Sequence, residues 1–257
     1  MRAKAVLHPG AIAACLLSLL LSGGCAARSR IAAPAAAPAG VTWLIVVDDL
    51  HLDFRKTGYI RNLLRSVSTG LIGDEDSFAM RSTGPSAVAI GPSPDRAILD
   101  AAISKVSGGA LGVAEITVPS RNLTDEIECR LDITFSAASG LLGDVPAPPG
   151  RRRAMLYISN GYETERGRVR ASAFSRAARR AGVIVFAMNV RGATGSQAIN
   201  NDVDVAFSPR VEASRRWSLR AIAEPTGGFA VLDEMDFAGA MSRIREKVTG
   251  SPVVRRR

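Results

Sequence analysis

The stretch T-W-L-I-V-V-D-D-L-H-L-D, residues 42–53, decides the fold. Its apolar, mostly branched run at 43–47 is typical of a strand buried on both faces of a parallel sheet. The run ends abruptly in four polar side chains: Asp48, Asp49, His51 and Asp53. In open α/β sheets, ligands bind outside the carboxyl ends of the strands. This cluster therefore indicates a site for a cation or a polar partner, although any one acid could simply cap the helix that follows.

Strand and helix patterns alternate along the rest of the chain. Short apolar runs bounded by turn residues predict strands at 77–82, 86–90, 154–159, 183–189 and 228–232. Helical periodicity predicts helices at 53–69, 94–106, 122–142, 165–181, 214–224 and 236–248. Residues 83–86 are the expected hairpin turn, and Ser93 is the expected helix cap. The alternation predicts an α/β fold, a three-layer, doubly wound, mostly parallel, Rossmann-like sheet.

Composition limits the classes of partner. The chain has 257 residues, of which 47% are hydrophobic and 22% charged, so it can form one globular domain of about 200 residues. Its formal net charge of +9 permits anionic partners such as phospholipid headgroups. The arginines are scattered, with short clusters at 151–153 and 255–257 and no aromatic residues between them. A solvated basic surface is therefore expected, and nucleic-acid binding is not.

The N-terminal residues have the pattern of a bacterial export signal. Residues 1–24 combine Arg2 and Lys4 with an apolar segment at 11–21 that is too short for a membrane span of about 20 residues. The sequence L-S-G-G-C, ending at Cys25, resembles a lipobox and predicts a lipidated cysteine. The alternative is ordinary cleavage near Ala26 and Ala27. The expected location is the periplasm, as a membrane-anchored lipoprotein or, alternatively, as a soluble periplasmic or secreted protein.

The expected domain plan follows from this leader. Residues 25–40 are rich in alanine and proline and predict an extended tether, residues 41–250 predict the folded domain, and residues 251–257 predict a basic tail. Once Cys15 leaves with the leader and Cys25 carries lipid, Cys129 has no intramolecular partner for a disulfide. Cys129 is expected to be a small buried residue of a helix.

The order of several short motifs resembles the von Willebrand factor type A domain, particularly the related domains of acidobacterial envelope proteins. The resemblance rests on five stretches that span the expected domain: L-I-V-V-D-D-L-H-L-D (44–53), P-S-P-D-R-A-I-L-D-A-A-I (92–103), R-R-A-M-L-Y-I-S-N-G (152–161), V-F-A-M-N-V-R-G (185–192) and L-R-A-I-A-E-P-T-G-G-F-A-V (219–231). It implies a metal-ion-dependent adhesion site, built from D-x-S-x-S after the first strand, a Thr from a later loop and an Asp after the fourth strand.

This sequence departs from each part of that site pattern. One register places Asp49, His51 and Asp53 on D-x-S-x-S, whereas the register from Asp48 meets two leucines. No Thr stands at a clear third position, and Asn160 replaces the final Asp. Three outcomes stay open: weak binding of Mg²⁺ (or Mn²⁺ or Ca²⁺), a different ion held through His51, or no ion. In the last case, the two acids bond neighbouring backbone amides and stiffen this edge of the sheet.

Enzyme motifs are absent from the sequence. After the leader, the chain has one histidine, His51, and it has neither a G-x-S-x-G elbow nor a phosphate-binding Walker loop. The expected function is protein–protein interaction at the edge formed by residues 48–53, 160–164 and 192–210. A metal-free scaffold that binds through its basic helices is the alternative, and a metal-dependent hydrolase built on the same acids is a weaker one.

Overall fold

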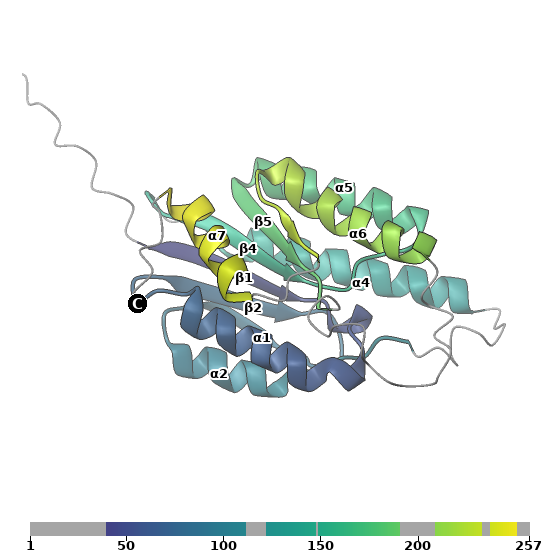
Figure 1. Cartoon of the computed structure of the whole chain (residues 1–257), viewed down its shortest axis with the longest axis horizontal. Coiled ribbons are helices and arrows are strands. Elements are labelled where there is room, and N and C mark those ends of the chain that lie inside the picture. The colour runs from purple at the N-terminus through teal and green to yellow at the C-terminus, as the bar shows by residue number, and fades with distance from the viewer. Residues whose placement is uncertain (1–39, 112–121, 148, 191–208, 233–236, 251–257) are drawn as a thin grey trace, which may run out of the picture. The chain divides into compact units, whose positions relative to one another are not determined.

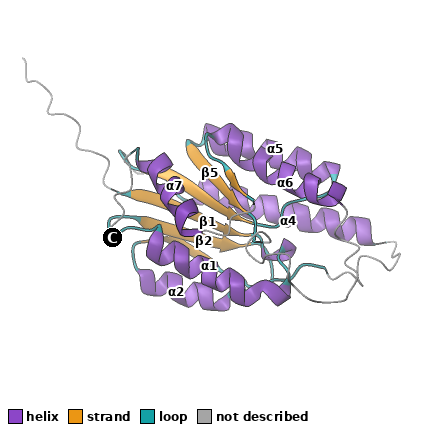
Figure 2. Ribbon diagram, viewed as in Figure 1, coloured by secondary structure: helices purple, strands orange, loops and turns teal. Residues whose placement is uncertain are grey.

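The computed structural model of the protein describes residues 40–111, 122–147, 149–190, 209–232 and 237–250. They contain a sheet of six strands with helices on both faces (Figure 1, Figure 2). In sheet order, the strands are β3 (Ala89–Ser93), β2 (Ser77–Ser82), β1 (Val41–Val47), β4 (Arg152–Ile158), β5 (Val183–Met188) and β6 (Ala230–Val231). Only the β2–β3 pair is antiparallel among these strands. The prediction of a three-layer, mostly parallel α/β sheet is confirmed.

The helices divide between two apolar layers. Helices α1 (Thr57–Gly70), α2 (Arg96–Lys105) and α7 (Phe237–Thr249) pack in one layer. Helices α4 (Leu123–Asp144), α5 (Glu165–Arg180) and α6 (Pro209–Ala223) cover the other face. Successive side chains of a strand point to opposite faces, so Trp43 and Ile45 enter the first layer while Leu44 and Val46 enter the second. This explains why the whole of β1 is buried and why all its residues except Thr42 are apolar.

The register of the three central strands brings their carboxyl ends together. Val47 pairs with Ser82 of β2 on one side and with Ile158 of β4 on the other. The residues that follow these strands therefore begin at one edge of the sheet. The chain leaves β1 towards β2 but later returns to its other side with β4, so the space between β1 and β4 is the topological switch point where ligands bind in such sheets.

A buried aspartate, Asp76, ties the opposite edge of the sheet. One carboxylate oxygen accepts from the N–H of Val41 at 2.7 Å. The other accepts from the indole of Trp43 at 3.0 Å, the N–H of Gly73 at 2.7 Å and the guanidinium of Arg245 at 2.6 Å. Asp76 thus connects the start of β1, the turn before β2 and helix α7.

Several sequence predictions differ from the structure in detail. Strand β3 starts at Ala89 rather than at 86, because the turn before it is held in a separate conformation described below. Asp95, and not Ser93, caps α2, by accepting from the N–H of Ala97 at 2.9 Å. Helix α6 begins at Pro209, five residues earlier than predicted, which places the proline in its first turn. Cys129 is exposed, so its predicted burial is wrong.

The expected export signal, the lipidated Cys25, most of the tether and the basic tail lie outside the described residues. Within the described ranges, no helix has both the length and the hydropathy that crossing a membrane requires.

Candidate functional site

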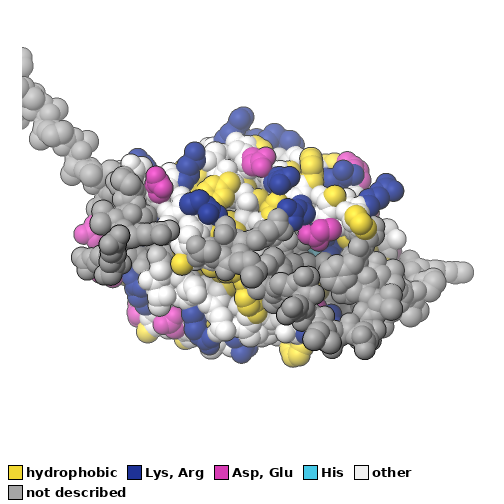
Figure 3. Space-filling view, in the orientation of Figure 1, with side chains coloured by type: hydrophobic (Ala, Val, Ile, Leu, Met, Phe, Trp, Pro, Cys, Tyr) yellow, Lys and Arg dark blue, Asp and Glu magenta, His cyan; other side chains and the backbone are white. Residues whose placement is uncertain are grey.

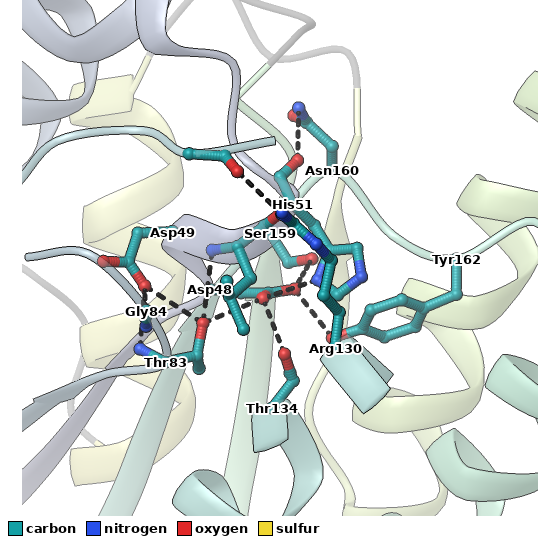
Figure 4. Close-up of polar contacts among 12 residues, drawn as sticks. Asp48, Asp49, His51, Thr83, Gly84, Arg130, Thr134, Ser159, Asn160 and Tyr162 are labelled. Carbon is teal, nitrogen blue, oxygen red and sulfur yellow. Dashed lines mark hydrogen bonds and ion pairs between the residues drawn. The ribbon is translucent and has the colours of Figure 1, made fainter. Parts of the chain in front are cut away.

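Asp48 is the first residue beyond β1, and its side chain is completely buried. Its N–H donates to the carbonyl of Ile158 at 2.9 Å, which fixes it beside β4. One carboxylate oxygen, Oδ2, accepts from the hydroxyls of Ser159 at 2.6 Å and Tyr162 at 2.8 Å. The other, Oδ1, accepts from the hydroxyl of Thr134, on α4, at 3.1 Å. Figure 4 shows these side chains converging on the carboxylate.

His51 completes this cluster from the same turn. The short 3-10 helix η1 (Asp49–His51) returns the imidazole to Asp48, and Nδ1 lies 2.8 Å from Oδ1. An ionised carboxylate can only accept, so Nδ1 carries the hydrogen of this contact. The ring also meets Tyr162 edge to face, with 5.0 Å between the ring centroids. These two contacts fix the orientation of the imidazole.

Thr83 bridges the two acids. Its hydroxyl lies 3.2 Å from Oδ1 of Asp48 and 3.0 Å from Oδ1 of Asp49. A hydroxyl has one hydrogen, so it donates to one carboxylate at a time, and the same oxygen accepts from the N–H of Leu50 at 3.3 Å. The residue that follows β2 is in this way joined to the turn that follows β1.

Asp49 is directed to the turn between β2 and β3 instead of the Asp48 cluster. Its Oδ1 accepts from the N–H groups of Thr83 at 2.8 Å and Gly84 at 2.6 Å, and its Oδ2 accepts from the N–H of Ser86 at 2.8 Å. A side chain at Gly84 would lie 2.6 Å from Leu50, so the turn can approach only because this residue is glycine. These contacts hold residues 83–86 in the turn, so β3 begins only at Ala89.

The electrostatics favour the ionised form of Asp48. Burial acts to raise the pKa of this carboxyl, but the charge of His51 and the hydrogen bonds from His51, Ser159 and Tyr162 outweigh burial and hold the pKa below its usual range. Burial, together with the nearby Asp48, raises the pKa of the Tyr162 and Tyr157 hydroxyls well above the ordinary value. Both hydroxyls therefore keep their hydrogens, and the two are in contact with each other.

The other expected site residues have separate positions. Asp53 lies near the surface, where it accepts from the N–H of Arg55 at 2.9 Å and pairs with its guanidinium at 2.8 Å. Asn160 lies beside the cluster, and its Nδ2 donates to the carbonyl of His51 at 3.1 Å. Its Oδ1 is buried without a hydrogen-bond partner. The structure therefore brings Asp48, His51 and Asn160 together, and most of the expected 192–210 loop lies outside the described residues.

The atoms available as ligands near Asp48 determine how well a cation fits this position. Both oxygens of Asp48 already accept hydrogen bonds, so an ion there would have to displace hydroxyl or imidazole donors. Within the described parts of the chain, no group of three or more His, Cys, Asp and Glu side chains has an arrangement that could hold a metal. Of the expected ligand atoms in the described residues, Oδ1 of Asn160 is buried and has no hydrogen-bond partner. These residues fit a hydrogen-bonded carboxylate better than an octahedral Mg²⁺ site.

Sequence reasoning missed four hydroxyl groups of this cluster. Thr83 and Ser159 directly follow β2 and β4, so the rule that parallel strands end at one edge could have indicated them. Thr134 lies in the middle of α4, and its position depends on how that helix crosses the sheet. Tyr162 depends on the course of the turn after β4. Neither has a local signal in the sequence.

Acid should destabilise the protein through Asp48 and Asp76. Burial opposes ionisation of both, but their hydrogen bonds outweigh it, and both pKa values are lowered. A carboxyl with a lower pKa in the folded chain stabilises the fold above its unfolded pKa of about 4, and this contribution is lost as the pH falls through the folded pKa. We expect the free energy of unfolding, measured in urea, to fall steeply below about pH 4. An Asp48→Asn chain should show a shallower decline, and an unchanged slope would contradict this assignment.

Comparisons with known proteins identify no family for the chain. No family model matches, and no curated protein matches. Among solved structures, the chain is similar to proximal thread matrix protein 1 from the mussel byssus, at 10% sequence identity and a TM-score of 0.42. The match covers 83% of this chain and 49% of that protein, so the chain spans about half the length of this structural neighbour.

Proposed function

We propose that the chain is a cell-envelope binding module with a von Willebrand A-like domain, and that the carboxyl edge of its sheet contacts a protein partner without a metal ion. The envelope location rests on the export and lipobox patterns of the leader. The domain type rests on the five ordered motifs of the sequence. A fold alone does not define an activity, so the proposed task depends on the residues at this edge.

One observation carries the proposal. Five side chains surround the buried carboxylate of Asp48 at the crevice between β1 and β4: His51, Thr83, Thr134, Ser159 and Tyr162. Both oxygens of this carboxylate accept hydrogen bonds from these side chains, which supports a contact surface that works without an ion. This hydrogen-bond network links the turns after β1, β2 and β4 and holds them in fixed positions. A surface that is already ordered loses little conformational entropy when a partner binds.

Exposed residues next to this network can contact the proposed protein partner. Phe54, in the 3-10 helix η2 (Phe54–Lys56) next to the Asp48 turn, has 68% of its side chain exposed. The paired Asp53 and Arg55 flank it, and Glu163 lies exposed after β4. An aromatic side chain surrounded by polar residues is the composition of an interaction hot spot.

Site-specific photocrosslinking at Phe54 tests the proposal. We expect benzoylphenylalanine at position 54 to capture a discrete protein in the cell envelope, and the same probe at Ile98, an exposed residue of α2, to capture none. Capture should be unchanged by EDTA, because the network contains no required ion. Equal capture from both positions, or none from position 54, would contradict binding at this edge.

An ion-dependent version of the same module is the second candidate. Its specific support is the buried and unpaired Oδ1 of Asn160, whose amide group bonds the backbone carbonyl of His51. Mg²⁺, Mn²⁺ or Ca²⁺ could take up this acceptor through bound water. Loss of crosslinking in EDTA, restored by one of these ions, would favour this candidate, and an Asn160→Ala chain should then lose the response.

A further inference from the structure

The outer surface of α5 and α6 is strongly basic. Helix α5 contains six arginines and one glutamate, and α6 contains four arginines and one glutamate. The two helices pack against each other on the same face of the sheet. Figure 3 shows basic side chains, with hydrophobic ones between them, on the side of the molecule where Figure 1 draws these helices. This surface is here called the α5–α6 face.

The arginines of α5 fall into two groups. Those of its first half are paired with acids: Arg166 with Glu128 and Arg170 with Asp132, both on α4, and Arg168 with Glu165. Those of its second half, at positions 176, 179 and 180, are exposed and have no ion-pair partner among the described residues. The second half of α5 thus presents uncompensated positive charge to the solvent.

Two exposed apolar side chains lie on the same two helices, at the ion-paired first half of α5. Trp217, on α6, is 46% exposed, and the guanidinium of Arg168 lies 5.6 Å from the centroid of its ring. Val169, on α5, is 59% exposed. Tryptophan and arginine together are characteristic of surfaces that lie at the boundary between lipid headgroups and water, because the indole is apolar with one polar N–H.

We infer that the α5–α6 face docks on a membrane surface of anionic phospholipid headgroups. The guanidinium groups distributed over this face complement a layer of lipid phosphates. Trp217 and Val169 can enter the boundary between the headgroups and the acyl chains. The lipobox at Cys25 points to the same partner. The inference is independent of the proposed binding edge, because it uses a different surface.

Vesicle binding by residues 37–257 tests the inference without any lipid anchor. This segment contains every residue of the apolar layers, which extend from Val41 to Val248. We expect it to sediment with vesicles of phosphatidylcholine and phosphatidylglycerol, but not with vesicles of phosphatidylcholine alone, and to be released by high salt. The emission of Trp217 should shift to shorter wavelength on binding. Trp43 is fully buried and should contribute no shift.

A pair of charge-reversal variants makes the test specific to this face. The double variant Arg176→Glu with Arg180→Glu should bind at least about 25-fold more weakly, since each basic residue near an anionic surface contributes about fivefold. The control, Arg65→Glu with Lys105→Glu, makes the same charge change at exposed positions of α1 and α2 and should bind as the parent chain does. All positions are exposed, so both variants should keep the parent's melting temperature.

Three results would overturn the inference. The first is equal binding to vesicles with and without phosphatidylglycerol. The second is an equal loss of binding in both double variants. The third is that the chain binds double-stranded DNA or an acidic protein and does not bind the anionic vesicles. None of these bears on crosslinking at Phe54, so failure of the inference and failure of the proposed function can be told apart.

Discussion

Replacement of Asp48 by asparagine should lower the free energy of unfolding by about 3 to 5 kcal/mol. In the parent chain, hydroxyls such as those of Thr134 and Ser159 donate to the two carboxylate oxygens of Asp48 at a completely buried site. In the variant, an NH₂ group replaces one of these oxygens and cannot accept from them. Buried donors left without an acceptor keep their desolvation penalty, and here several lose their acceptor at once. Urea denaturation, followed by the fluorescence of the buried Trp43 and by circular dichroism, measures the change.

The neighbouring acid Asp53 provides the matched control. Asp53→Asn is also a change from acid to amide in the same turn, but the carboxylate of Asp53 is partly exposed and bonds Arg55 near the surface. A partly exposed ion pair contributes about 1 kcal/mol or less, and asparagine can still accept the capping hydrogen bond. If the Asp48 variant lost no more stability than this control, the network would not be a structural anchor. Stabilisation of the parent chain by millimolar Mg²⁺ would likewise contradict a metal-free edge.

Replacement of Asp76 by alanine should cost a similar amount, about 3 to 5 kcal/mol. It removes the acceptor for Val41, Trp43 and Gly73 and leaves the guanidinium of Arg245 without its carboxylate. Thermal and urea unfolding should both show the loss, and the emission of Trp43 should change because the indole N–H loses its partner.

Asp74→Ala is the control for this second prediction. Its side chain is fully exposed and pairs with Arg96, so no measurable loss is expected. The two anchors lie at opposite ends of β1, on the order of 20 Å apart, so the effects of Asp48→Asn and Asp76→Ala should be additive. Strong non-additivity would show that the two ends of the sheet are coupled.

The buried strands were the most predictable part of the fold. Their apolar runs are long and uninterrupted, so β1, β4 and β5 were placed to within two residues and the parallel sheet followed from their alternation with helices. Strand β3 was misplaced because Asp49 holds the preceding turn through side-chain bonds that no local pattern reveals. The sequence did not indicate the role of Asp76, because a polar residue directly before a strand is common and its partners meet only in the folded chain.

The position of the acids was predictable, but their contacts were not. The acids at the end of β1 were expected beyond the carboxyl ends of the strands, and Asp48 and Asp49 lie there. Whether those acids face solvent or accept hydrogen bonds depends on residues from β2, α4 and β4, which meet only in the folded chain. The sequence pattern therefore indicated candidate ligands for an ion. It could not show that the hydroxyls of Thr134 and Tyr162 already bond the carboxylate of Asp48.

The connection between Asp76 and Arg245 has a consequence for how the chain acquires its structure. The opening strand shares its apolar layer with α7, and the acid beside that strand is completed by a guanidinium that is translated more than 160 positions later. A nascent polypeptide cannot complete this arrangement until nearly all of it has been synthesised. Strand β1 therefore lacks its contacts with α7 and Arg245 until the last helix has been synthesised, although β2, β4 and α1 can cover part of it earlier. Part of this apolar layer stays exposed during that interval.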